Sequence, residues 1–156
     1  MLFYAIALVV AAIDQMLKIA VRVYMEVGES ASLWNGRILL TYYENSGAAR
    51  SSFQGYGRLF MVVGIVVIVG LLIARRKGHI KGFLAESGTA LLVGGAAGNT
   101  LDRMLYGKVT DFLVMGEGIL NAADLALTAG PALLLLHVVV QEWRERTGSY
   151  RHDISG

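Results

Sequence analysis

The chain has 156 residues, of which 55% are hydrophobic, and a formal net charge of only +2. This share of apolar residues exceeds what the core of a soluble protein of this size encloses, so the composition predicts an integral membrane protein. The basic residues lie at the ends of apolar segments rather than along one face, which argues against a nucleic-acid partner. The chain has no cysteine, which excludes disulfides, thiol nucleophiles and Cys-based zinc sites.

Four apolar segments approach or exceed the roughly 20 residues that a helix needs to cross the hydrocarbon core. They cover about 2–23, 57–75, 83–105 and 120–140. Basic residues are densest between the second and third segments, from Arg75 to Lys81, and after the fourth. The positive-inside tendency places these regions, and with them both termini, in the cytoplasm. The segments 24–56 and 106–119 then face the outside. The sequence thus predicts an all-α membrane protein of four transmembrane helices in a single domain, 1–156.

The first outer segment has the pattern of a β-hairpin. Asn35-Gly36 is typical of a type I′ turn, and the run from Arg37 to Tyr43 is rich in strand-forming residues. Trp34 suits the interfacial zone of a membrane, where an aromatic ring with a polar tip is stable. We therefore expect a small extracytoplasmic β-sheet, which is either an ordinary hairpin or one that holds a substrate.

Polar residues interrupt the third and fourth apolar segments and the connection between them: Asn99, Asp102, Arg103, Asp111, Asn121 and Asp124. A charge in a membrane segment is costly and indicates a functional site or a buried pair. Spacings of three and four residues place Asn99, Asp102 and Arg103 on one side of a helix. The small residues from Gly94 to Gly98 allow a neighbouring helix to come close. A purely structural ion pair of Asp102 with Arg103 is an equally good interpretation of that pair.

Two aspartates are predicted at the same outer depth. Asp111 lies in an alternating stretch that predicts a short strand, and Asp124 lies in the first turn of the fourth helix. An isolated aspartate near a helix N-terminus is commonly a cap. Two carboxyl groups that share a site differ in protonation, however, so that one acts as a base toward water while the other hydrogen-bonds a carbonyl oxygen.

The chain contains five short motifs in this order: Asp14-Gln15-Met16-Leu17-Lys18, Asn45-Ser46-Gly47-Ala48-Ala49, Gly98-Asn99-Thr100-Leu101-Asp102-Arg103, Val109-Thr110-Asp111-Phe112 and Asn121-Ala122-Ala123-Asp124. Together they resemble the motifs of the lipoprotein signal peptidases, also called signal peptidase II, a family of bacterial membrane aspartic proteases. One difference is Arg50-Ser51-Ser52 after the second motif, where the family usually continues with an apolar residue.

This resemblance implies that Asp111 and Asp124 are the catalytic dyad of an aspartic endopeptidase. Its reaction is removal of the signal peptide from a bacterial prolipoprotein, just before a cysteine that carries diacylglycerol. The implied location is the bacterial plasma (inner) membrane, with the active site near the extracytoplasmic face. The expected partners are the diacylglyceryl-prolipoprotein substrate and membrane lipids. We expect a monomer that needs no metal or organic cofactor.

The other motif residues are expected to support the dyad. The residues predicted to bind or position the substrate are Asn45, Gly47, Asn99, Arg103 and Asn121. Amide side chains donate and accept hydrogen bonds without changing charge, and the arginine is expected to hold a backbone carbonyl or to pair with Asp102. The predicted structural polar residues are Asp14, Lys18 and Asp102, with Asp14 and Lys18 one helical turn apart as a mutual ion pair.

Two other function classes account for some of the same residues. A small proton-coupled transporter or channel subunit uses intramembrane charges, but it needs them through the whole membrane depth. A noncatalytic membrane scaffold explains Asn99 and Arg103 as helix-packing residues. It does not explain two aspartates at one depth.

Overall fold

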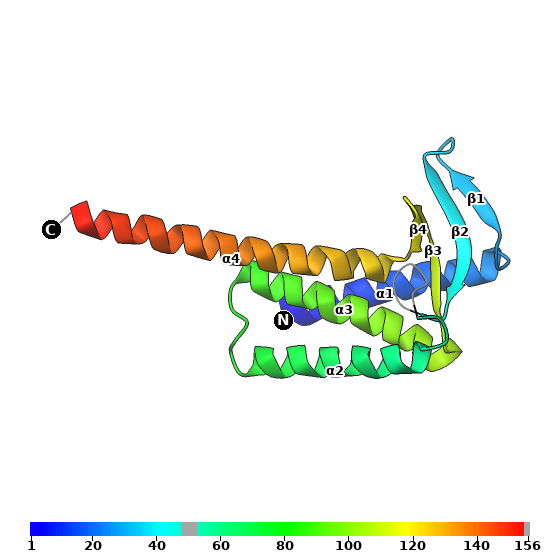
Figure 1. The fold of residues 1–156 in the computed structure, drawn as a ribbon, viewed down its shortest axis with the longest axis horizontal. Helices are drawn as coiled ribbons and strands as arrows, with labels where there is room; N and C mark the ends of the chain where they lie inside the picture. The colour runs from blue at the N-terminus through cyan, green and yellow to red at the C-terminus, as the bar shows by residue number, and fades with distance from the viewer. Residues whose placement is uncertain (48–52, 155–156) are drawn as a thin grey trace.

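The structure is a computed structural model that describes residues 1–47 and 53–154. Four helices account for most of it: α1 (Leu2–Tyr24), α2 (Gly57–Arg76), α3 (Phe83–Tyr106) and α4 (Ala122–Ile154). They run along one common direction, with a β-sheet at one end and both chain termini toward the other (Figure 1). Five residues that the sequence analysis singled out, Ala48, Ala49, Arg50, Ser51 and Ser52, lie outside the described residues.

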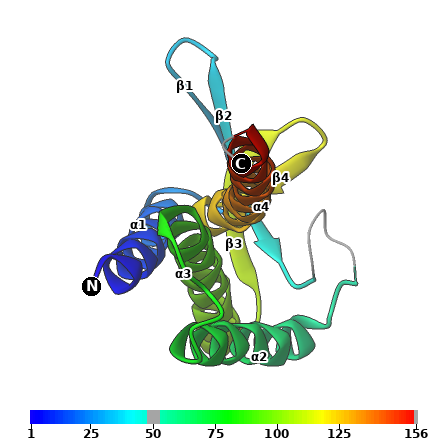
Figure 2. The ribbon, with the colours of Figure 1, turned by 90° about the vertical axis from the view of Figure 1, so that its left-hand side faces the viewer.

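Helix α3 is the centre of the bundle. It contacts each of the other three helices, and Figure 2 shows it between α1, α2 and α4. Small residues make this possible, because a Cβ at Gly94 would lie 2.7 Å from the Ala7 carbonyl oxygen of α1. A Cβ at Gly95 would lie 2.6 Å from the Ala123 carbonyl oxygen of α4. The predicted close approach of neighbouring helices to this glycine-rich stretch is therefore confirmed.

Three helices are long and apolar enough to cross a membrane, judged by length and composition: α1, α2 and the part of α4 from Ala122 to Thr147. Within the described chain, α3 is not one of them, although it has 24 residues. Its sequence carries Glu86, Asp102 and Arg103 among many small residues. Length and composition thus confirm three of the four predicted transmembrane helices.

The fourth helix is longer than the apolar segment that predicted it. The predicted transmembrane segment ends near residue 140, and the helix continues to Ile154. No proline follows that point, and the exposed side chains of Glu142 and Arg146 form an ion pair of 2.9 Å across one turn, an arrangement that stabilises a helix in water. The prediction ended the helix where its hydrophobicity ended, whereas the helical backbone continues into polar sequence.

The sheet is antiparallel, with the strand order β1-β2-β3-β4. Its strands are β1 (Ser30–Leu33), β2 (Ile38–Asn45), β3 (Val109–Met115) and β4 (Gly118–Leu120). The predicted hairpin is confirmed: Asn35 and Gly36 both have positive φ, as a type I′ turn requires, and connect β1 to β2. The second hairpin, β3–β4, joins β2 through the pair Tyr43 and Asp111. Val21 of α1 packs against Tyr42 and Phe112, which fixes the sheet to the helices.

Candidate active site

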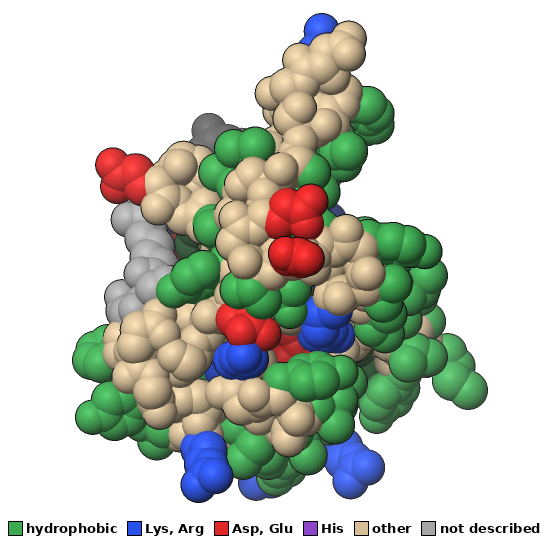
Figure 3. Space-filling view, turned by 90° about the vertical axis from the view of Figure 1, so that its right-hand side faces the viewer, with side chains coloured by type: hydrophobic (Ala, Val, Ile, Leu, Met, Phe, Trp, Pro, Cys, Tyr) green, Lys and Arg blue, Asp and Glu red, His purple; other side chains and the backbone are tan. Residues whose placement is uncertain are grey.

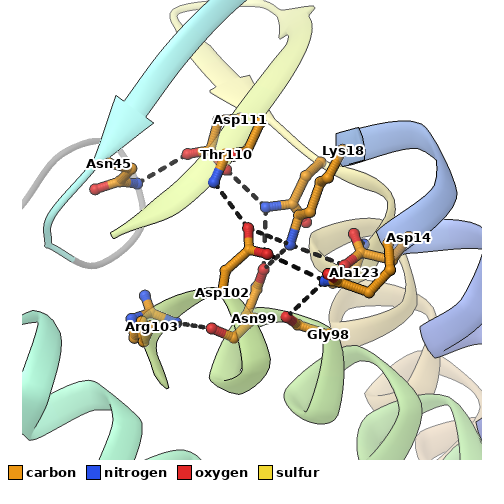
Figure 4. Close-up of polar contacts among 12 residues, drawn as sticks. Asp14, Lys18, Asn45, Gly98, Asn99, Asp102, Arg103, Thr110, Asp111 and Ala123 are labelled. Atoms are coloured by element: carbon orange, nitrogen blue, oxygen red, sulfur yellow. Dashed lines mark hydrogen bonds and ion pairs between the residues drawn. The ribbon is translucent and has the colours of Figure 1, made fainter. Parts of the chain in front are cut away.

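A buried group of charges joins α1 to α3 at the end of the bundle that carries the sheet (Figure 4). Lys18 is fully buried, and its Nζ lies 2.8 Å from Asp14 Oδ2 and 3.3 Å from Asp102 Oδ2. Asp14 Oδ1 accepts a hydrogen bond of 2.8 Å from the backbone N–H of Ala123, at the start of α4. The predicted pair of Asp14 with Lys18 is present in the structure. It holds three helices together, because the carboxylate of α1 binds α4 and the ammonium reaches α3.

Asp102 binds α1 and β3 rather than its neighbour Arg103. Its Oδ1 lies 3.3 Å from Arg22 Nη1, and its Oδ2 accepts a hydrogen bond of 3.0 Å from the Thr110 backbone N–H. Arg22 also donates to the Thr110 hydroxyl at 2.9 Å, and its guanidinium stacks on Tyr106 at 4.6 Å. These contacts fix the residue that immediately precedes Asp111 in the chain.

The orientation of the Asn99 amide follows from the buried lysine. An ammonium only donates hydrogen bonds, so its 2.8 Å contact to Asn99 requires the carboxamide oxygen on that side. The Asn99 NH₂ group then faces the opposite way and donates to Asp124 Oδ1 at 2.8 Å. The Asn99 oxygen also accepts a hydrogen bond of 3.1 Å from Asn121 Nδ2. Asn99 therefore connects the charged group on α1 to Asp124 on α4.

Asp111 projects from β3 into a fully hydrogen-bonded position. It is 2% exposed, and its two carboxyl oxygens accept hydrogen bonds from Asn45 Nδ2 at 2.9 Å and Asn121 Nδ2 at 2.6 Å. Burial, together with the nearby charge of Asp124, raises the pKa of Asp111 to about 6, against the opposing effect of the two amides. Below that pH, Asp111 holds its proton in the folded protein.

Asp124 lies in the first turn of α4 and is half-buried. Asn121, the residue before that helix, donates its backbone N–H to Asp124 Oδ2 at 3.2 Å, and its side-chain oxygen accepts the Asp124 N–H at 2.9 Å. This reciprocal pair is a capping box. The same Asn121 donates its side-chain NH₂ to Asp111. Asn121 thus contacts both carboxyl groups and brings the first half of β3 together with the start of α4.

Arg103 closes the site from the side of β2. It donates from Nη2 to the Gly47 carbonyl at 2.9 Å and from Nη1 to the Asn99 carbonyl at 3.3 Å. Its guanidinium lies 5.6 Å from the centre of the Phe60 ring of α2. Its Nε is buried and has no hydrogen-bond partner among the described residues. Of the two roles expected for this arginine, the structure contains the carbonyl contact.

A cavity of about 400 Å³ opens between α2, α3 and α4 beside these groups. Its polar lining side chains are Asn99, Thr100, Arg103, Asp124 and Thr128. Most of the remaining wall is apolar, and it includes Phe60, Val63, Val67, Leu120 and Leu127. At the end of the molecule that carries the sheet, acidic and basic side chains lie close together, with hydrophobic side chains around them (Figure 3). The cavity thus has a largely apolar wall with the carboxyl group of Asp124 at its polar part.

All ten sequence-predicted site residues fall into one connected network. Gln15 and Arg22 belong to it as well, and the sequence analysis gave neither of them a role. Gln15 Nε2 donates to Asp14, to Asp102 and to the Gly98 carbonyl at 3.1–3.2 Å. The spacing of Asp14, Lys18 and Arg22 by four residues each was the available signal, since it places all three on one face of α1. Among the described residues, no group of three or more His, Cys, Asp or Glu side chains could hold a metal ion.

Comparisons with known proteins agree on one family. The family model described as signal peptidase (SPase) II matches residues 6–140. The lipoprotein signal peptidase of Gloeobacter violaceus is 37% identical over 145 residues, which cover 91% of this chain and 84% of that protein. The lipoprotein signal peptidase of Halothermothrix orenii is 39% identical over 140 residues, 89% of this chain and 96% of that protein.

A solved structure has the same fold. It is described as a bacterial membrane enzyme and has a TM-score of 0.82 at 28% sequence identity, with 90% of this chain and 88% of that chain covered. The family match spans most of the chain and includes all five motifs. The chain belongs to the signal peptidase II family and is a multi-pass membrane protease.

Proposed function

We propose that this chain removes signal peptides from prolipoproteins with Asp111 and Asp124 as its catalytic pair. The observation that carries the assignment is the position of Asn121, which hydrogen-bonds both carboxyl groups. No serine or cysteine nucleophile is needed, because two carboxyl groups in different protonation states supply both an acid and a base.

The two aspartates take different roles because their surroundings differ. Asp111 is the more buried and holds the shared proton, in agreement with its raised pKa. The ionised Asp124 takes a proton from water, whose oxygen attacks the scissile carbonyl, while Asp111 transfers its proton to the carbonyl oxygen. In the second step Asp124 gives its proton to the leaving amine. Asp111 recovers a proton from the hydroxyl group as the carbonyl forms again, which returns both aspartates to their starting states.

The cavity beside Asp124 supports a substrate that is itself embedded in the membrane. Its wall between α2 and α4 is mostly apolar, which matches a hydrophobic signal segment or an acyl chain. Arg103 has a buried Nε at the polar part of this wall, and Asn45 and Gly47 lie across from it on the β2 side. We assign these three residues to holding the peptide next to the dyad.

The proposed topology has four transmembrane helices in one peptidase domain, 1–156, with α3 crossing inside a ring of the other three. Its charged side chains Asp102 and Arg103 are paired or hydrogen-bonded within the protein, which lowers the cost of placing them at membrane depth. The cluster from Arg75 to Lys81 lies at the end opposite the sheet, as do both termini (Figure 1). This supports cytoplasmic termini and an active site near the extracytoplasmic face. We propose that the protein works as a monomer among membrane lipids.

The experiment that tests this function compares two substrates. Purified protein in detergent is given a prolipoprotein with and without diacylglycerol on the cysteine, and the new N-terminus is identified by mass spectrometry. The proposal expects a cut immediately before the lipid-bearing cysteine and no cut in the unmodified substrate. Asp124→Asn is expected to abolish cleavage while leaving the helix content unchanged. Cleavage at another position, or full activity of the variant, would contradict the proposed function.

A further inference from the structure

A second cavity lies at the other end of the bundle, where the start of α3 meets α4. It has a volume of about 300 Å³ and is lined by Lys81, Gly82, Phe83, Leu84, His137, Val140, Gln141 and Arg144. In Figure 1 the start of α3 lies against the middle of α4, far from the sheet and the aspartates. The proposed peptidase chemistry gives this cavity no role.

The charges around this cavity are unbalanced. Lys81 and Arg144 line it, and no carboxylate does. Among the described side chains neither of them has an ion-pair partner, whereas two neighbouring arginines are paired: Arg75 with Glu86 at 2.7 Å and Arg146 with Glu142 at 2.9 Å. His137 and Gln141 add two further side chains that can donate hydrogen bonds. The cavity therefore presents positive charge and donors, which is the chemistry that a phosphate group needs.

The depth of the cavity favours a lipid over a free anion. Arg144 follows the first residue of α4 by 22 positions, which corresponds to about 33 Å along a helix and is close to the ~30 Å thickness of the hydrocarbon core. The same cavity has apolar walls from Phe83, Leu84 and Val140. Phe83 is 70% exposed and thus available to an acyl chain. A basic pocket between helices at a membrane surface is a known mode of binding lipid headgroups.

We propose that this cavity binds the phosphate of an anionic phospholipid through Lys81 and Arg144, with its acyl chain along Phe83 and Val140. The site is independent of the aspartate pair. Its occupant ties the α2–α3 connection to the middle of α4 on the membrane side opposite the active site.

The test is a lipid titration of the delipidated full chain in detergent, followed by native mass spectrometry. Phosphatidylglycerol is compared with phosphatidylcholine and with inorganic phosphate. We expect 1:1 binding of phosphatidylglycerol only. The double variant Lys81→Gln/Arg144→Gln is expected to weaken it about 25-fold, at about fivefold per cation.

The matched control is Lys77→Gln/Arg146→Gln, which removes the same charge from outside the cavity. We expect this control to change the affinity by less than about threefold, because both side chains are exposed, neither lines the cavity, and salt screens exposed charges. Equal losses in both double variants would show diffuse attraction and overturn the site. Equal binding of phosphatidylcholine, or binding of inorganic phosphate as tight as that of phosphatidylglycerol, would overturn the assignment to an anionic lipid. Peptidase activity is not needed for any of these readouts, so failure here is separable from failure of the proposed function.

Discussion

The fully buried ammonium of Lys18 is the group whose removal tests the polar network most strictly. It contacts Asp14 and Asp102 and donates to Asn99 at 2.8 Å. Lys18→Met retains an unbranched side chain of similar length and removes the charge with its donors. The change leaves two buried carboxylates close to each other with less positive charge to balance them. It also removes the donor that fixes the Asn99 amide toward Asp124.

Removal of one partner from a buried ion pair costs about 3–5 kcal/mol. We expect Lys18→Met to lower the free energy of unfolding by about 3 kcal/mol, at the lower end of that range. Other donors remain, since Asp14 keeps the Ala123 N–H and Asp102 keeps Arg22. Neutralising one carboxylate as well relieves part of the repulsion. The double variant Asp14→Asn/Lys18→Met should therefore be more stable than the sum of the single changes predicts, by about 1–3 kcal/mol.

The assay is equilibrium unfolding of the four proteins in detergent micelles, followed by far-ultraviolet circular dichroism. The exposed pair Glu142 and Arg146 is the matched control, because its cycle should give a coupling of less than about 1 kcal/mol. Signal-peptide cleavage by Lys18→Met is measured on protein that is still folded, and we expect it to fall at least tenfold. Additive effects of Asp14→Asn and Lys18→Met within about 0.5 kcal/mol would refute the network as described.

Three further predictions concern packing, pH and substrate binding. Gly95→Ala places a Cβ 2.6 Å from the Ala123 carbonyl oxygen, so it should lower the free energy of unfolding by about 1–3 kcal/mol. The control is Gly70→Ala, whose Cβ meets nothing within 4 Å and which should not destabilise the protein in the same unfolding assay. Because the pKa of Asp111 is raised to about 6 by burial, the folded state holds the proton more tightly than the unfolded state. Stability is then lost as the pH rises from about 4 through about 6, by on the order of 3 kcal/mol, and Asp111→Asn should remove this loss in unfolding measured at pH 4 and pH 7. Arg103→Lys loses the two-pronged contact to backbone carbonyls and should reduce kcat/KM at least tenfold in the cleavage assay, with an unchanged circular dichroism spectrum.

Local spacing made much of the site predictable. Asp14 and Lys18 are four residues apart, and such residues meet on any helix whatever its neighbours. The Asn35-Gly36 turn and the strand that carries Asp111 follow equally from local pattern, since φ and side-chain alternation are properties of short segments. For the same reason Asp124 was correctly placed in the first turn of α4.

The partners across elements were not predictable in the same way. Asp102 was expected to be a structural residue, paired with Arg103 in the structural interpretation, whereas its pairing with Lys18 and Arg22 of α1 depends on how α3 is rotated against its neighbours. Arg22 received no role in the sequence analysis, because its partners Asp102 and Thr110 lie 80 and 88 positions away in the chain. The extension of α4 to Ile154 did not follow from the apolar pattern, because hydrophobicity ends near residue 140 while the helical backbone continues into polar sequence.

The central claim is that Asp111 and Asp124 act together as acid and base. Its most direct test is the single-turnover rate of cleavage of a diacylglyceryl-modified prolipoprotein by the wild type, Asp111→Asn, Asp124→Asn and Glu44→Gln. Glu44 is the control, an acidic residue of the same sheet that pairs with Lys108 outside the dyad. The account predicts a loss of at least about a thousandfold in each aspartate variant and less than about threefold in Glu44→Gln. Folded protein with either aspartate replaced that still cuts before the lipid-bearing cysteine at near the wild-type rate would contradict it.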